Sequence, residues 1–333
     1  MTPLSSPFPW FGGKRRVADV VWARFGDVPN YVEPFFGSGA VLLGRPSPWA
    51  GTETVNDKDG FIANFWRALA ADPGQVAHFA DWPVNENDQH ARHIWLVHQR
   101  ETLTARLEGD AAYYDAKIAG WWVWGICCWI GAGWCSGNGP WSVDDGKLVH
   151  LRTAGAGVNR QLVHLRTAGM GVNRKRVHLG TAGMGETNGG LLAWMQALAE
   201  RLRYVRVCCG DWSRVCGSTP TMRLGTTAVF LDPPYSEDER QPDLYSVDGD
   251  MADDVRAWAF SVGDDPLMRV ALCGYAGEHS MLGWTEYTWK ADGGYGLQGN
   301  GSGRANAERE VIWFSPHCVI PDHQPSLFEE VAL

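Results

Sequence analysis

The chain lacks several features that would place it in a common class of protein. None of its eight cysteines forms a Cys-x-x-Cys pair or combines with histidine at the spacing of a zinc site. The N-terminal segment has no apolar run of the kind a secretory signal needs, so we expect buried thiols in a reducing compartment. Positive charge is also scarce. The 29 Lys and Arg residues are outnumbered by 38 Asp and Glu, and the net charge of −9 argues against nucleic-acid binding by the surface as a whole.

Long hydrophobic runs are nearly absent. Residues 118–134 are uncharged over 17 positions, which is the lower limit for crossing a membrane, but they include five Trp and four Gly. We therefore expect a buried helix that runs into a loop, and no membrane contact. The overall hydrophobic content of 45% is that of a protein with a sizeable core.

The order of the apolar segments predicts an α/β fold. Short apolar runs predict strands at residues 31–32, 53–55, 205–209, 228–231, 270–273 and 311–314. Helical periodicity marks residues 14–25, 61–70, 191–202 and 251–262. A strand, a glycine turn and a helix near the N-terminus are typical of a doubly wound unit. We predict one α/β domain formed by residues 1–60 and 201–316, a mostly helical insert at 61–200, and a loose tail at 317–333.

A tandem repeat of 14 residues lies inside the predicted insert. Its copies begin at residues 148, 162 and 176 and share the pattern VHLxTAGxG. Residues 147–185 contain no Asp or Glu and seven basic residues, which are Lys147, Arg152, Arg160, Arg166, Arg174, Lys175 and Arg176. This local excess of positive charge predicts an arm that follows DNA phosphates. A duplicated surface loop without a partner is the alternative.

A glycine loop and an acidic residue predict a nucleoside site. The loop FFGSG at residues 35–39 has Leu42 where a GxGxxG dinucleotide fingerprint has its third glycine, which weakens a nicotinamide cofactor. Such a loop fits a ligand without pyrophosphate, for example the adenosyl-methionine moiety. Asp57 ends the next strand and can accept hydrogen bonds from ribose hydroxyls. A role of Asp57 as the N-cap of the following helix is compatible with this one.

The segment FLDPPYS at residues 230–236 is the most specific motif. A buried strand ends at Asp232, and Pro233 and Pro234 stop both helix and ladder pairing. The Asp232 carboxylate and the Pro233 carbonyl can then bind the two hydrogens of an exocyclic base amine and favour its attack on a methyl sulfonium. Tyr235 can stack on a base that has left the duplex. A plain turn after the strand is the alternative.

Five motifs in this order, PFPWFGGK, YVEPFFGSGAV, VND, GDW and LDPPY, resemble the DNA adenine methylases of the Dam type, the alpha group of amino-methyltransferases, with phage-encoded members closest. The resemblance implies a doubly wound mixed sheet of the class I methyltransferase (Rossmann-like) type, with the insert as target-recognition domain. It also implies that S-adenosyl-L-methionine is the cofactor. The resemblance assigns the cofactor to Trp10, Lys14, Phe35, Phe36, Gly37, Gly39, Asp57, Asp211, Trp212 and Asp232. Catalysis falls to Asp232, Pro233, Pro234 and Tyr235, and DNA binding to Arg152, Arg160, Arg166, Arg174, Lys175 and Arg176.

We therefore predict a site-specific methyltransferase that acts on N6 of a flipped-out adenine in double-stranded DNA. We expect no metal, a cytoplasmic location (the host cytoplasm if the gene is a phage's), and a monomer in preference to an oligomer. N4-cytosine methylation usually has Ser at position 232, and protein-amide methylation usually has Asn. An inactive DNA-binding relative remains an alternative, as does hydride transfer. C5-cytosine chemistry is excluded by the absence of a Pro-Cys dipeptide. The recognition hairpin of Dam is not recognisable, so no target sequence is transferred.

Overall fold

The computed structural model describes residues 4–10, 14–47, 50–129, 134–135, 188–217, 220–234, 251–279, 281–289 and 310–321, and the backbone of 141–144 and 147–150. Its helices are η1 (Lys14–Arg16), α1 (Ala18–Phe25), α2 (Ala40–Leu43), α3 (Gly60–Ala71), α4 (Pro73–Ala80), α5 (Glu86–Gly109), α6 (Ala116–Cys128), α8 (Asn188–Leu202), α9 (Ser213–Cys216), η2 (Pro220–Arg223) and α10 (Met251–Gly263). Its strands are β1 (Asn30–Glu33), β2 (Thr52–Asp57), β3 (Trp141–Asp144), β4 (Lys147–His150), β5 (Val205–Cys209), β6 (Thr227–Leu231), β7 (Met268–Tyr275), β8 (Thr285–Thr288) and β9 (Glu310–Phe314).

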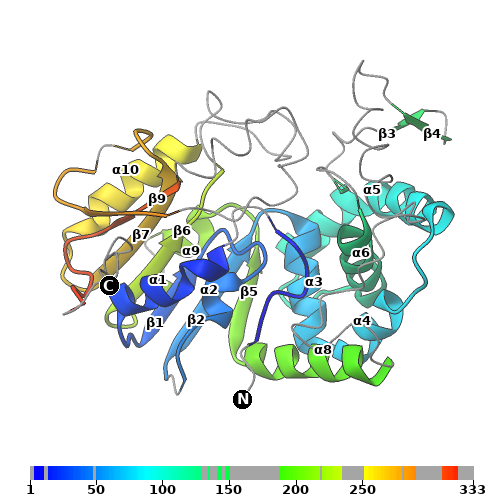
Figure 1. Ribbon diagram of the computed structural model, residues 1–333, viewed down its shortest axis with the longest axis horizontal. Helices are drawn as coiled ribbons and strands as arrows, with labels where there is room; N and C mark the ends of the chain where they lie inside the picture. The colour runs from blue at the N-terminus through cyan, green and yellow to red at the C-terminus, as the bar shows by residue number, and fades with distance from the viewer. Residues whose placement is uncertain are drawn as a thin grey trace, which may run out of the picture.

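Seven strands form one mixed sheet in the order β5-β2-β1-β6-β7-β9-β8. The neighbours from β5 to β7 are parallel, whereas β9 runs antiparallel to both β7 and β8. Helices lie on both sides of this sheet (Figure 1). The predicted α/β class with a mixed sheet is confirmed, and the arrangement is consistent with a class I methyltransferase fold.

The central strands are apolar because both of their faces are covered. Every residue of β6 is buried, as expected for a parallel strand between two helical layers. Tyr31 and Phe230 belong to a core with α1 and α3, while Val32 and Val229 belong to a second core with α10. Adjacent residues of one strand thus point into different cores, which is the period of two of a strand with two covered faces.

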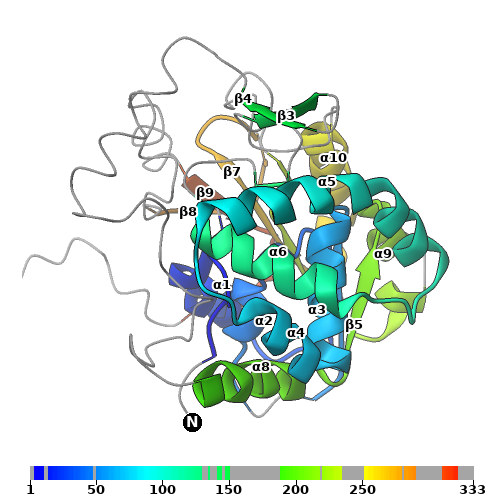
Figure 2. The same cartoon turned by 90° about the vertical axis from the view of Figure 1, so that its right-hand side faces the viewer.

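The predicted helical insert begins with four consecutive helices, and each of them starts at an N-cap side chain. The side chains of Asp59, Asp72, Asn85 and Asp115 accept a backbone hydrogen bond at the start of α3, α4, α5 and α6. Together with α8 these helices form a bundle, seen face on in Figure 2. The uncharged segment 118–134 belongs to the mostly buried helix α6 as far as Cys128. In the described part of the chain, no helix is both long and apolar enough to cross a bilayer.

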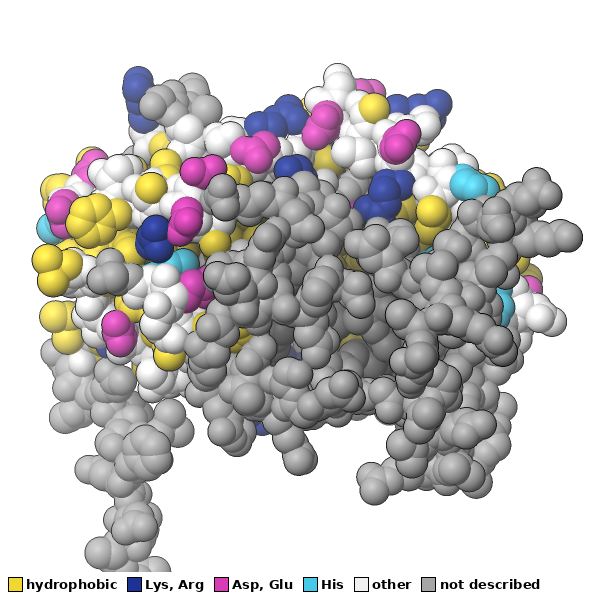
Figure 3. Space-filling view, turned by 90° about the horizontal axis from the view of Figure 1, so that it is seen from above, with side chains coloured by type: hydrophobic (Ala, Val, Ile, Leu, Met, Phe, Trp, Pro, Cys, Tyr) yellow, Lys and Arg dark blue, Asp and Glu magenta, His cyan; other side chains and the backbone are white. Residues whose placement is uncertain are grey.

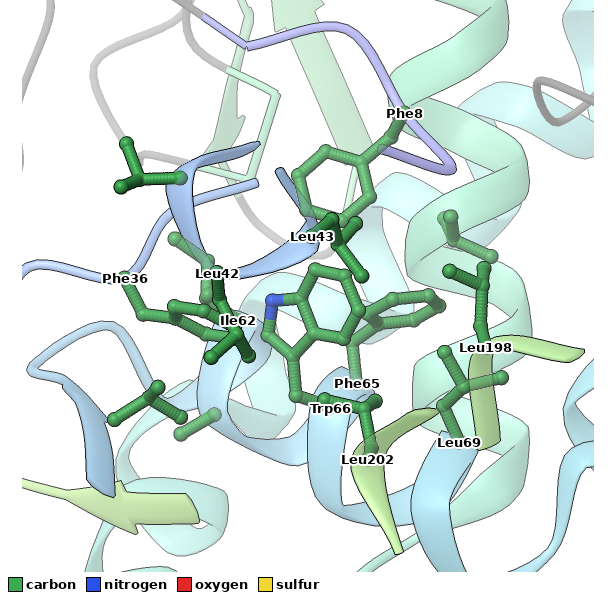
Figure 4. Close-up of a cluster of buried hydrophobic side chains, with 14 of the residues drawn as sticks. Phe8, Phe36, Leu42, Leu43, Ile62, Phe65, Trp66, Leu69, Leu198 and Leu202 are labelled. Carbon is green, nitrogen blue, oxygen red and sulfur yellow. The ribbon is translucent and has the colours of Figure 1, made fainter. Parts of the chain in front are cut away.

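The bundle and the sheet share one hydrophobic core. Trp66 of α3 is fully buried, and Figure 4 shows it among Phe65, Leu42 and Leu43, with Leu198 and Leu202 of α8 close by. The predicted boundary at residue 60 therefore falls at the start of α3, a helix that packs on the bundle and on β5. The two parts are not separate packing units. The predicted domain limits therefore stay a proposal about which residues bind the cofactor and which recognise the target.

Two features differ from the sequence-based expectations. Strand β8 was not expected, since its segment TEYT is mostly exposed and offers no apolar run. The tail does not start loosely at residue 317, because Cys318 is buried and the Val319 amide donates to the carbonyl of Arg24 in α1. The eight cysteines are free thiols, as expected, and all are buried except Cys208, which is half-buried.

A buried ion cluster ties α8 to the sheet. Glu53 of β2 is only 5% exposed, and its carboxylate accepts from Arg45 at 2.9 Å and from both terminal nitrogens of Arg201 at 2.7 and 2.9 Å. Arg201 also donates to the carbonyl of Leu42. Because one carboxylate balances two buried guanidinium groups, it cannot be neutralised without leaving positive charge unpaired.

We expect Glu53→Gln to lower the free energy of unfolding by about 3 kcal/mol, because two buried guanidinium groups lose their counter-charge while the shape is kept. Glu200→Gln is the matched control, since Glu200 pairs with Arg203 on the exposed face of α8 at 3.4 Å and should contribute less than about 1 kcal/mol. Denaturant unfolding of both variants measures the difference. Equal losses would contradict the role of the buried cluster.

Candidate active site

The glycine loop is shaped by contacts that leave no room for side chains. Gly37 and Gly39 have φ values of +48° and +67°, the left-handed region that favours glycine. A Cβ at Gly37 would lie 2.6 Å from Nε1 of Trp10, and one at Gly39 would lie 2.8 Å from the ring of Phe36. The Gly37 carbonyl accepts from the indole of Trp66 at 2.8 Å. The structure thus brings the predicted loop residues and Trp10 together.

Asp57 lies directly against this loop. One carboxylate oxygen accepts from the Gly37 amide and the other from the Asp59 amide, each at 2.9 Å. The N-cap of α3 is Asp59, whose side chain accepts from Phe61 at 2.8 Å, so the N-cap role considered for Asp57 is wrong. The sequence placed the cap two residues too early because both positions are Asp and both precede the helix.

Burial and the neighbouring carboxylate of Asp59 raise the pKa of Asp57 to about 7, although hydrogen bonds from the Gly37 and Asp59 amides oppose this shift. Asp57 is half-buried at the end of its strand. Each carboxylate oxygen accepts one backbone hydrogen bond and has a second lone pair available. The group therefore retains capacity for two further donors when it is ionised.

The GDW segment follows β5 at the same edge of the sheet. Asn56 donates to the carbonyls of Pro34 and Gly210, and the Gly210 amide donates to the Asp57 carbonyl. These bonds join the ends of β1, β2 and β5.

The residues after Gly210 differ in exposure. Asp211 is exposed, and its carboxylate accepts from the Ser213 amide at 3.0 Å and the Ser213 hydroxyl at 2.5 Å. Trp212 is half-buried against the same core as Phe35. The aromatic part of this segment thus packs on the second core, as Phe35 of the glycine loop does, while its carboxylate faces solvent.

Asp232 follows β6, the strand on the other side of β1, and is paired with a buried lysine. Its Oδ1 lies 3.0 Å from Nζ of Lys14, a side chain only 7% exposed. The same ammonium lies 3.3 Å from Oε2 of Glu310 in β9 and 5.6 Å from the ring centroid of Trp289. Pro233 is buried and Pro234 half-buried next to it. Lys14, predicted to hold the cofactor, is thus in direct contact with the predicted catalytic acid.

The charge balance keeps this lysine protonated. Burial alone would lower the pKa of Lys14, but the carboxylates of Asp232 and Glu310 raise it above its usual range. Two negative charges share one positive charge in this buried cluster. The ammonium therefore fixes the position of one Asp232 oxygen, and the other oxygen has no hydrogen-bond partner among the described residues.

Two acidic residues of the site were missed from the sequence. Glu310 precedes the apolar run VIWF, and nothing in the pattern connects it to Lys14, which lies 296 residues away. Glu33 ends β1 and is 2% exposed, and its carboxylate accepts from the hydroxyl of Tyr31 at 2.7 Å. Burial raises the pKa of Glu33 well above its usual range, opposed by the bond from Tyr31 and reinforced by the charge of Asp232. The sequence offered one signal for each residue, because Glu33 ends one apolar strand and Glu310 begins another.

Several predicted site residues lie outside the described residues. These are Tyr235, Arg152, Arg160, Arg166, Arg174, Lys175 and Arg176. Among the residues that the structure describes, no three His, Cys, Asp or Glu side chains gather in a way that could hold a metal ion.

Comparison with known families gives a match that begins at Trp10. Residues 10–110 match the model of the D12 class N6 adenine-specific DNA methyltransferases. The family predicted from the motifs is confirmed. The matched segment contains Lys14, the glycine loop and Asp57, and ends before Asp232. A comparison with curated proteins finds no match. The family supports methylation of adenine N6 in DNA as the activity, and a phage origin stays a prediction.

We expect Lys14→Met to lower the free energy of unfolding by about 3 kcal/mol, because it leaves the carboxylates of Asp232 and Glu310 close together without a counter-charge. Adding Glu310→Gln should restore part of the loss. Arg15→Met, at an exposed neighbouring position, should leave stability unchanged. A double-mutant cycle in denaturant measures the coupling, and purely additive effects of Lys14 and Glu310 would contradict the cluster.

Proposed function

We propose that the chain transfers a methyl group from S-adenosylmethionine to N6 of an adenine flipped out of double-stranded DNA. The family match supports adenine methylation. The observation that carries the mechanism is the Asp232 carboxylate, held by Lys14 at 3.0 Å at the sheet edge where the glycine loop also lies. The free thiols fit the cytoplasm, which we propose as the place of action.

The residues at the end of β1 and β2 fit a nucleoside cofactor. The left-handed glycines let the loop backbone pack closely against Trp10 and Phe36, and the spare acceptor capacity of Asp57 suits two ribose hydroxyls. Trp10 packs against the loop, Phe35 begins it, and Trp212 offers an aromatic surface at the end of β5. When bound, S-adenosylmethionine supplies an electrophilic methyl group on its sulfonium.

The chain's own contribution is to orient the adenine amine. In an aromatic amine the nitrogen lone pair is delocalised into the ring, so the amine is a poor nucleophile. We propose that the free oxygen of Asp232 and the carbonyl of Pro233 accept its two hydrogens and favour a pyramidal nitrogen. Lys14 fixes the position of Asp232, because it already binds the other carboxylate oxygen. Tyr235 is proposed to stack on the flipped base.

Binding of DNA is proposed for the helical insert and its basic repeats. Figure 3 looks onto the molecule from above the view of Figure 1, and on its coloured part Lys and Arg side chains are interspersed with Asp and Glu. Such a mixed surface provides little attraction for a polyanion. We therefore propose that the seven basic residues of 147–185 supply it, with residues 61–200 as the target-recognition region.

The proposal is tested by product analysis. We expect DNA incubated with the protein and labelled cofactor to yield N6-methyladenine after digestion to nucleosides. Asp232→Ala should lower the transfer rate by about 10²–10³-fold through loss of one amine acceptor, with cofactor affinity retained. Asp254→Ala, at an exposed position of α10, is the matched control and should keep full activity. Label on cytosine N4, or wild-type turnover of Asp232→Ala, would overturn the mechanism.

The raised pKa of Asp57 predicts a pH-dependent affinity for the cofactor. Below about pH 7 the carboxyl is protonated, so it loses acceptor capacity for ribose. Affinity should therefore rise with pH and be about tenfold weaker at pH 6 than at pH 8, the ratio of ionised fractions for a pKa near 7. Titration calorimetry at both pH values measures this. Asp57→Asn should bind more weakly and lose this part of the pH dependence, whereas an unchanged pH profile would contradict the ribose role.

A further inference from the structure

A pocket of about 870 Å³ opens in the helical bundle, between α4, α5, α6 and α8. Its aromatic lining consists of Phe79, Trp82, Trp95 and Trp121, and α5 contributes Asp88, Arg92 and Trp95 from one face of the helix. None of its lining residues belongs to a strand, to the glycine loop or to the Asp232 cluster. Figure 2 shows these helices in front of the sheet. The pocket is therefore separate from the candidate active site.

Arg92 at this pocket carries a buried donor nitrogen without a hydrogen-bond acceptor among the described residues. The residue is 6% exposed, and its buried Nη1 has no hydrogen-bond partner in the described part of the chain. The guanidinium lies 5.0, 4.9 and 4.3 Å from the ring centroids of Trp82, Trp121 and Trp124. Ring faces attract the cation but do not replace an acceptor for its donors.

The nearest carboxylate on the same helix face is engaged elsewhere. Oδ2 of Asp88 accepts from the indole of Trp82 and from the amide of Asn85, each at 2.6 Å. Burial lowers the pKa of Arg92, with only partial compensation from the charge of Asp88. A buried donor without an acceptor is costly and rare, so it calls for a partner that the protein itself does not supply.

The lining defines the chemistry of that partner. Indole faces favour a planar ring, and a guanidinium favours a carbonyl or carboxylate oxygen. The acidic residues Asp81 and Asp88 also line the pocket. Lys117 is not a lining residue, and its ammonium lies 4.6 and 4.4 Å from the ring centroids of Trp95 and Trp121. An aliphatic ligand would fill space but leave Nη1 of Arg92 unbonded. The volume is that of a site for a small molecule.

We propose that this pocket binds a planar aromatic molecule that carries a carbonyl or carboxylate oxygen, with its ring against Trp82 and Trp121 and its oxygen accepting from Arg92. Nucleobases and aromatic carboxylates share this chemistry. The site goes beyond the methyl-transfer function and shares no residue with it.

The test uses the full-length protein and two probes, guanosine and indole-3-carboxylate, titrated by calorimetry with S-adenosylhomocysteine present to occupy the proposed cofactor site. We expect at least one probe to bind with a Kd below about 1 mM. Binding of guanosine alone identifies the nucleobase class, and binding of indole-3-carboxylate alone identifies the aromatic acids. Cyclohexanecarboxylate has the same acceptor without a planar ring and should bind at least about tenfold more weakly than the better probe.

Arg92→Leu removes the donors but keeps apolar packing against the indoles, and it should weaken binding of that probe at least about tenfold. Lys117→Leu is the matched control, because Lys117 is a cation over Trp121, as Arg92 is, but is not itself a lining residue of the pocket, and the variant should bind within about twofold of the unchanged protein. Unfolding curves check that both variants fold; Arg92→Leu should be no less stable, since it removes an unpaired buried charge. The proposal is wrong if neither probe binds, if cyclohexanecarboxylate binds equally well, or if a folded Arg92→Leu retains full affinity.

Discussion

Parallel alignment of β5, β2, β1 and β6 is the constraint on which the candidate site depends. Parallel strands end at one edge of the sheet, and there β5 leads to Asp211, β2 ends in Asp57, β1 leads to the glycine loop and β6 leads to Asp232. The parallel alignment alone brings together segments that lie up to 200 residues apart in the chain. The bonds from Asn56 to Pro34 and Gly210 then fix three of these ends together.

A second constraint is the balance of buried charge at this edge. Lys14 holds one oxygen of Asp232 and is itself held by Glu310. Without Glu310, the Lys14 ammonium would have only one carboxylate partner and its position would be less restricted. Glu310 comes from β9, an antiparallel strand two positions from β6 in the sheet, and it therefore connects the position of the proposed catalytic acid to the antiparallel part of the sheet. The site is thus built by the whole sheet, not by the motif segments alone.

Local patterns predicted more of this protein than long-range contacts did. The strand at 205–209 was predicted at its observed limits, and the glycine loop and Asp57 were recognised as neighbours because strand, turn and helix follow one another directly. The N-cap was misplaced from Asp59 to Asp57, since two carboxylates with the same spacing rules compete for one helix start. Glu310 could not be connected to Lys14, because a contact across 296 residues leaves no periodicity. Strand β8 was missed for a similar reason, as its pairing with β9 and not its own sequence makes it a strand.

Lys14 and Arg92, two buried cations in the described part of the chain, also show where pairing inside the protein is complete and where it is not. Lys14 has two carboxylates within 3.3 Å, and its charge is satisfied within the protein. Arg92 has aromatic faces within 5.0 Å, and its buried Nη1 has no hydrogen-bond partner in the described part of the chain. Both are buried to a similar degree, so the cost of desolvation does not distinguish them. A charge balanced by the fold stabilises the fold, whereas a charge balanced only by ring faces leaves binding energy available to a molecule that brings its own acceptor.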